Sequence, residues 1–181
     1  MADETLSIIF TVEDGTCVSG ANSYISLEEA NQYQTNKGRS DWLALTDEEK
    51  LTSLIKGTQY VDALYTWKGR RKYQSQELSF PRVMLRDRDG FIVDGIPKAI
   101  KQAVCEAAFY GYQAELFTTH SENGQIKRKK VDGAVEVEYF NASEGTEDFI
   151  SKYAALDSLL KGLYFEKGAC ADINAIAGWD Y

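Results

Sequence analysis

The stretch Thr46–Arg71, TDEEKLTSLIKGTQYVDALYTWKGRR, contains the strongest amphipathic helix pattern in the chain. Its apolar residues recur every three or four positions, the spacing that gathers side chains on one face of a helix. The residues of this face are Leu51, Leu54, Ile55, Thr58, Val61, Leu64 and Tyr65. Thr46 is the expected N-cap, because Glu49 three residues later completes a capping box. The stretch predicts a long helix, ended before Gly69 and followed by cations, on which other helices can pack.

Three further helices are expected, which makes the fold mainly α, a bundle of about four helices. A second capping box, formed by Ser26 and Glu29, opens a helix over about 27–37. A third helix should start at Pro97 and end near Phe117, and its small residues indicate close approach to a neighbouring helix. The last helix is expected over about 147–163.

Two alternating runs within 126–140 predict a β-hairpin that protrudes from the bundle. Asp132-Gly133 is the preferred pair for a two-residue turn between them. In that register the cross-strand pairs are Lys127 with Glu138, Lys129 with Glu136, Arg128 with Val137 and Lys130 with Val135. Each lysine–glutamate pair contributes ~0.2–1 kcal/mol, so half of the positive charge is neutralised locally. The hairpin residues expected to contact neighbouring subunits or tail proteins are Lys127, Arg128, Lys129, Lys130, Glu136 and Glu138.

We expect one helical domain over 1–163, opened by a short extended segment near Leu6–Val12, and a C-terminal tail over 164–181. The tail carries apolar and aromatic residues without a helical or strand period. These residues are Tyr164, Phe165, Ile173, Ile176, Trp179 and Tyr181. Such residues either pack on their own domain or bind a partner, here a portal protein or a neighbouring subunit.

Composition narrows the possible functions. The 181 residues carry a net charge of −8, so a general electrostatic attraction to nucleic acid is not expected. The three cysteines, Cys17, Cys105 and Cys170, are isolated, which suits a reducing compartment. The N-terminus lacks the features of a signal peptide and no apolar run reaches membrane-spanning length, so we expect a cytoplasmic protein without membrane contact.

The motifs of common enzymes are absent from the sequence. His120 is the single histidine, and no serine or cysteine motif accompanies it. The sequence contains no phosphate-binding loop, no dinucleotide fingerprint and no zinc-protease motif. We therefore expect no catalytic residue, no metal site and no cofactor.

One basic cluster lies beside the aromatic residues Trp67 and Tyr73, and sites for single-stranded nucleic acid often interleave cations with aromatic residues in this way. Its candidate DNA contacts are Trp67, Lys68, Arg70, Arg71 and Lys72. The alternative is that these cations complement the negative end of the preceding helix while Trp67 belongs to the core.

Ordered blocks along the chain resemble a family of tailed-bacteriophage proteins. The blocks are Glu13-Asp14-Gly15-Thr16, Gly20-Ala21-Asn22-Ser23-Tyr24-Ile25-Ser26, Tyr60-Val61-Asp62, Tyr65-x-Trp67-x-Gly69-x-Arg71, Leu78-x-Phe80-Pro81-Arg82, Asp89-Gly90, Ile96-Pro97, Lys127-Arg128-x-Lys130-Val131-x-Gly133 and Val135-Glu136-Val137-Glu138-Tyr139. Together they cover about Val12 to Leu163. The chain is similar to the head–tail connector, or adaptor, proteins, whose members are often labelled DnaT-like single-stranded-DNA-binding proteins.

The resemblance implies a structural virion protein. A connector forms a homo-oligomeric ring, a dodecamer, between the portal protein and the tail or its stopper and terminator proteins. Packaged double-stranded DNA passes through the ring, which lies in the neck of the virion after assembly in the host cytoplasm. Because the chain is acidic and shows no stacking platform, we expect this role. The alternative is a DnaT-like single-stranded-DNA-binding protein of phage replication.

Overall fold

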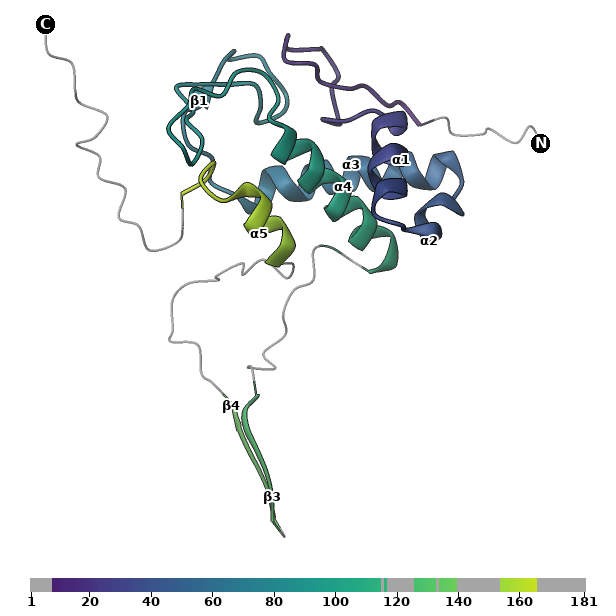
Figure 1. The fold of residues 1–181 in the computed structure, drawn as a ribbon, viewed down its shortest axis with the longest axis vertical. Helices are drawn as coiled ribbons and strands as arrows, with labels where there is room; N and C mark the ends of the chain where they lie inside the picture. Colours follow the sequence, from purple (N-terminus) through teal and green to yellow (C-terminus); the bar gives the residue numbers. More distant parts are fainter. Residues whose placement is uncertain (1–7, 115, 117–125, 133, 140–153, 166–181) are drawn as a thin grey trace, which may run out of the picture. The chain divides into compact units, whose positions relative to one another are not determined.

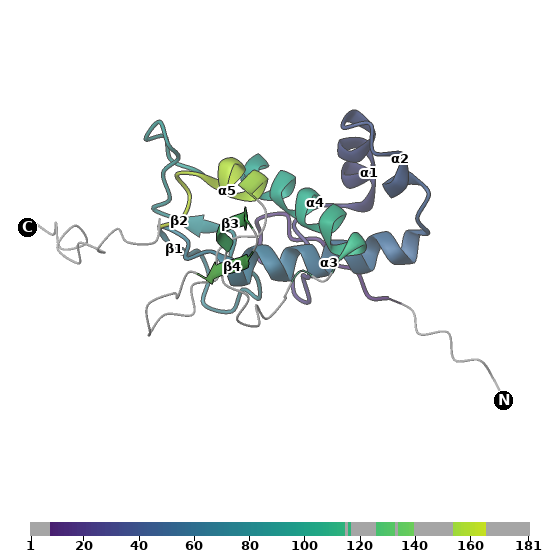
Figure 2. The same cartoon turned by 90° about the horizontal axis from the view of Figure 1, so that it is seen from below.

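The computed structural model describes residues 8–114, 116, 126–132, 134–139 and 154–165. Its internal contacts divide the chain into two compact units. The first unit comprises Met1–Leu116 and Ser151–Tyr181, and the second comprises Phe117–Ile150. Figures 1 and 2 show the helices of the first unit and the hairpin of the second. The mainly α fold with one hairpin is confirmed.

Two helices begin where the capping boxes predict. In α1 (Leu27–Asn36), the Ser26 hydroxyl accepts a hydrogen bond from the Glu29 N–H at 3.2 Å. In α3 (Asp47–Leu64), the Thr46 hydroxyl accepts from the Glu49 N–H at 3.3 Å. Each glutamate also bonds back to the N–H of its cap, so two otherwise unpaired donors are satisfied at each helix start. Such caps stabilise a helix by about 1 kcal/mol.

The core of the first unit lies between α3 and α4 (Lys98–Gln113), which run side by side (Figures 1 and 2). The largest apolar side chains that are fully buried are Trp42, Tyr24, Phe80, Leu54, Leu85, Ile100, Leu156 and Leu160. At one end α1 packs against α2 (Ser40–Leu43), and α5 (Ala154–Leu160) packs against α4. The helix expected from Pro97 to near Phe117 ends at Gln113, four residues earlier, because Ala114 is its extended C-cap. The predicted start of the last helix lies outside the described residues.

Short β pairings connect the helices. β1 (Arg70–Arg71) pairs antiparallel with β2 (Arg82–Val83), a ribbon that the sequence pattern did not predict. In the N-terminal extended segment, Val12 forms an isolated bridge with Ser23.

The hairpin of the second unit consists of β3 (Ile126–Asp132) and β4 (Ala134–Tyr139). Its observed pairs include Asp132 with Ala134, Lys130 with Glu136, Lys129 with Val137 and Arg128 with Glu138. The expected register is therefore wrong by one residue. Asp132, which was expected in the turn, is paired with Ala134 as the last residue of β3. A one-residue shift exchanges the two faces of a strand. Both glutamates still pair with cations, but with Arg128 and Lys130 in place of the two predicted lysines.

Residues 163–165, just after α5, pair with the segment that follows α3. Tyr164 forms an antiparallel bridge with Trp67, and the Phe165 N–H donates to the Thr66 carbonyl at 2.9 Å. The Lys68 N–H donates to the Leu163 carbonyl at 3.0 Å. Residues 163–165 therefore belong to the first unit as a short extended segment, and 166–181 lie outside the described residues.

Candidate nucleic-acid interface

Arg82 holds the ribbon that carries the basic cluster. Its guanidinium donates to four backbone carbonyls, those of Lys68 at 2.7 Å, Gly69 at 2.9 Å, Ser79 at 3.1 Å and Trp67 at 3.4 Å. The carbonyls come from the segments that precede β1 and β2, so one planar side chain links the turn before β1 to the chain that leads into β2. These hydrogen bonds therefore fix the backbone at the start of β1, which carries Arg70 and Arg71.

The segment Arg70–Tyr73, which we call the basic segment, lies on the surface. Arg70, Arg71 and Lys72 are exposed, and Tyr73 is 41% exposed. The Lys72 ammonium lies 5.7 Å from the centre of the Tyr73 ring and 3.8 Å from an oxygen of exposed Asp94. The backbone is fixed here too, because the Lys72 N–H donates to the Pro81 carbonyl at 3.1 Å. Three cations beside an accessible ring can contact phosphates and a base.

Trp67 and Lys68 have structural positions instead. The Trp67 ring is only 7% exposed and packs edge-on against Phe80, with ring centres 5.0 Å apart. A base cannot stack on it there, so Trp67 belongs to the core, the alternative reading of the sequence. The Lys68 ammonium donates to the Gly162 carbonyl at 2.9 Å, just after α5. It therefore neutralises the negative end of that helix.

A buried polar network joins Tyr24, Asp62 and the backbone just before β2. The Tyr24 hydroxyl donates to the Asp62 carboxylate at 2.8 Å, and the Ser79 N–H donates to the same carboxylate at 2.9 Å. The Phe80 N–H donates to the Tyr24 oxygen at 3.1 Å. Burial raises the pKa of Asp62 above its usual value, while these hydrogen bonds and the charge of Arg71 oppose that shift. The network ties α3 to the chain that leads into β2.

The comparison with family models matches residues 8–177, almost the whole chain. The matching family is described as "Putative DnaT-like ssDNA binding protein". The chain belongs to this family. No curated protein and no solved structure matches it.

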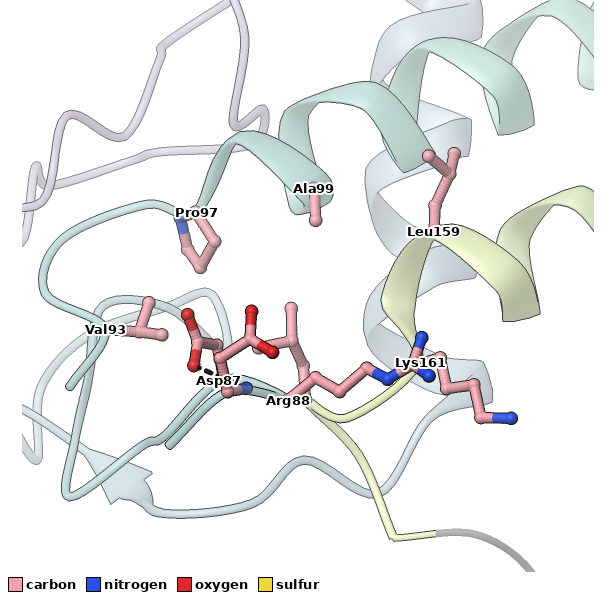
Figure 3. A pocket seen from close by; sticks show the side chains of 9 residues that line it. Asp87, Arg88, Val93, Pro97, Ala99, Leu159 and Lys161 are labelled. Carbon is pink, nitrogen blue, oxygen red and sulfur yellow. Dashed lines mark hydrogen bonds between the residues drawn. The ribbon is translucent and has the colours of Figure 1, made fainter. Parts of the chain in front are cut away.

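In this DnaT-like chain two further exposed arginines, Arg86 and Arg88, lie on the loop Met84–Ile92. The loop borders a pocket of about 280 Å³ between the start of α4 and the end of α5 (Figure 3). The residues that line it are Asp87, Arg88, Asp89, Val93, Pro97, Ala99, Leu159, Lys161 and Leu163. Figure 3 shows Arg88 extending toward Lys161, while Asp87 accepts two backbone N–H groups of its own loop. Two cations and two aspartates give the pocket no preference for a phosphate.

Tyr73 and Arg82 are not among the DNA contacts predicted from the sequence. Tyr73 directly follows the cluster that the sequence singled out, and its exposure could not be inferred from that position. Of the predicted hairpin contacts, the structure describes only the backbone pairing. The predicted tail contacts Ile173, Ile176, Trp179 and Tyr181 lie outside the described residues, and Tyr164 packs against Tyr65 with ring centres 4.7 Å apart.

In the described part of the chain, no group of three or more histidine, cysteine, aspartate and glutamate side chains could hold a metal ion. Within the same residues, no helix is both long and apolar enough to cross a membrane.

Proposed function

We propose that this protein binds single-stranded DNA through the basic segment Arg70–Tyr73. The family to which the chain belongs favours this role over the connector role that the sequence analysis put first. The observation that carries the proposal is the exposure of three consecutive cations beside Tyr73, 41% exposed, on a backbone fixed by Arg82. The function proposed is binding without catalysis.

The charges determine how such binding should behave. With a net charge of −8, attraction to DNA must be local and not spread over the whole surface. If the three cations each neutralise one phosphate, the logarithm of affinity falls with that of salt with a slope of about −2. Tyr73 can add base stacking, which contributes about 1–3 kcal/mol per base and does not depend on sequence.

The test is fluorescence anisotropy with a labelled oligothymidylate at several salt concentrations. We expect Arg70→Ala/Arg71→Ala to weaken binding at least tenfold and to flatten the salt slope. Tyr73→Ala should weaken binding at every salt concentration, whereas Tyr73→Phe keeps the ring and most of the affinity. Lys56→Ala/Lys98→Ala removes two exposed cations from helices and is the matched charge control. Equal weakening by the control pair, or tight binding that survives loss of the basic segment, would contradict the proposal.

A second candidate function is the head–tail connector, a ring in the virion neck through which double-stranded DNA passes. One observation favours it. Met84, Phe91 and Ile92 are 77%, 70% and 70% exposed, and large apolar side chains held in water are typical of surfaces that an assembly covers. A cryo-EM map of the neck of the particle tests this function, because density for the α3–α4 pair and its hairpin must appear between the portal and the tail.

A further inference from the structure

The loop Met84–Ile92 holds apolar side chains in solvent by a defined set of hydrogen bonds. The Asp87 N–H donates to the Phe91 carbonyl at 2.9 Å, and the Asp87 carboxylate accepts from the Asp89 and Phe91 N–H groups at 3.0 and 2.9 Å. The Arg86 guanidinium donates to the Gly90 carbonyl at 2.6 Å. Exposure of Phe91 and Ile92 is therefore built into the fold of the loop. A surface of this kind is suited to a partner whose charge and apolar character complement it.

The end of the first unit that carries the loop Met84–Ile92 has a net positive charge. Residues 68–72 and 84–94 together contain six cations, Lys68, Arg70, Arg71, Lys72, Arg86 and Arg88, against three aspartates, Asp87, Asp89 and Asp94. The two stretches are neighbours, because Arg70 pairs with Val83, the residue before Met84. The end of the unit that carries the loop therefore combines exposed apolar side chains with a net positive charge.

The opposite end of the same unit has the complementary character. Residues 40–50, which cover α2 and the start of α3, contain four acidic residues, Asp41, Asp47, Glu48 and Glu49, and one lysine. All four acidic residues are exposed, and among them Leu43 is 45% exposed. This end is negative with an apolar side chain at its surface.

The two ends are separated by the length of α3. The helix has 18 residues and so spans about 27 Å. Figures 1 and 2 agree in placing α2 at one end of α3 and β1 at the other. One copy therefore cannot bring its own two ends together. A second copy can, and the contact would join different surfaces, which leaves one end of each kind open for the next copy.

We propose that copies of this chain associate head to tail, with the loop Met84–Ile92 of one copy seated on the α2 end of the next. Phe91 and Ile92 lie against Leu43, and the surrounding arginines face Asp41, Asp47 and Glu48. The apolar contact provides association and the charges set its direction, since loop-to-loop or α2-to-α2 pairing would bring like charges together.

Sedimentation velocity without DNA tests this proposal, so its outcome is independent of whether the chain binds single-stranded DNA. We expect the mean mass of the wild-type protein to rise between about 1 and about 100 μM, the range in which interfaces of modest affinity form. Phe91→Asp and Leu43→Arg should each remain monomeric over this range. An equimolar mixture of the two variants should form dimers and nothing larger, because one intact loop end and one intact α2 end remain in each pair.

The mixture also serves as the folding control, because a misfolded variant could not restore a dimer. A wild-type protein that stays monomeric would overturn the proposal. So would dimers of Leu43→Arg alone, which would show loop-to-loop pairing. Oligomers that persist in both single variants would place the interface elsewhere on the chain and overturn it as well.

Discussion

The backbone of Gly57 on α3 lies directly against the backbone of Ala108 on α4. A Cβ atom added at Gly57 would lie 2.9 Å from the Ala108 nitrogen and 3.0 Å from the Val104 carbonyl oxygen. Both are backbone atoms, which cannot rotate away as the end of a side chain can. The close helix approach that the small residues of α4 predict is therefore confirmed, and a glycine in α3 completes it.

We predict that Gly57→Ala destabilises the protein although alanine is the better helix former. Overpacking at backbone contacts costs about 1–3 kcal/mol, more than the gain of about 1 kcal/mol in helix propensity. Gly111→Ala in α4 is the matched control, because its Cβ would meet a rotatable methyl group of Leu116 at 2.8 Å. Urea unfolding should show the larger loss at Gly57. A Gly57→Ala protein as stable as wild type would show that the helices can separate freely.

Tyr24→Phe should lower stability by more than its small change in volume implies. The substitution leaves the buried Phe80 N–H without its acceptor and Asp62 without one donor. A buried group that loses its partner costs about 1–3 kcal/mol. Tyr73→Phe removes the same hydroxyl from an exposed ring and should change the unfolding free energy by less than ~0.5 kcal/mol. Equal effects in thermal unfolding would mean that the Tyr24 network adds nothing to stability.

The stability of the protein should depend on pH through Asp62. Because burial raises the pKa of Asp62 in the folded state above its usual value of 3.8, the folded state binds more protons than the unfolded state just above that pH. The contribution of this group to stability therefore falls as pH rises through the folded pKa. Asp62→Asn carries no charge at any pH, so its stability relative to wild type should increase from about pH 4 to about pH 7. A constant difference in urea unfolding free energy over this range would show that the pKa is not raised.

We predict that loss of the Lys68 ammonium lowers stability, whereas loss of the Lys72 ammonium lowers the affinity for DNA. Lys68→Met removes the hydrogen bond to the Gly162 carbonyl, which should cost about 1 kcal/mol of stability. It should leave the affinity for an oligothymidylate within about twofold, because the ammonium already faces α5. Lys72→Met is the reverse case, with an exposed ammonium, little effect on stability and weaker DNA binding. If Lys68→Met weakened DNA binding more than Lys72→Met, the assignment of Lys68 to the structure and of Lys72 to the DNA-binding surface would be wrong.

The sequence alone was sufficient for the starts of α1 and α3 and for the mainly α fold. A capping box joins residues three apart, as Ser26 with Glu29 and Thr46 with Glu49, so its geometry depends on the local chain only. The hairpin was likewise visible from its alternation. Its register was not, because a shift of one residue leaves glutamates opposite cations in both cases and local pairing energies hardly differ.

Only the tertiary structure decided which members of the basic cluster are available to a ligand. Trp67 and Lys68 are adjacent to Arg70 and Arg71 in the chain, yet they are held by Phe80, Tyr164 and Gly162. Gly162 lies 94 residues from Lys68, and no sequence pattern encodes such a pairing. Burial and exposure depend on which distant segments pack together. For that reason the sequence could identify the cluster but could not separate its structural residues from those on the surface.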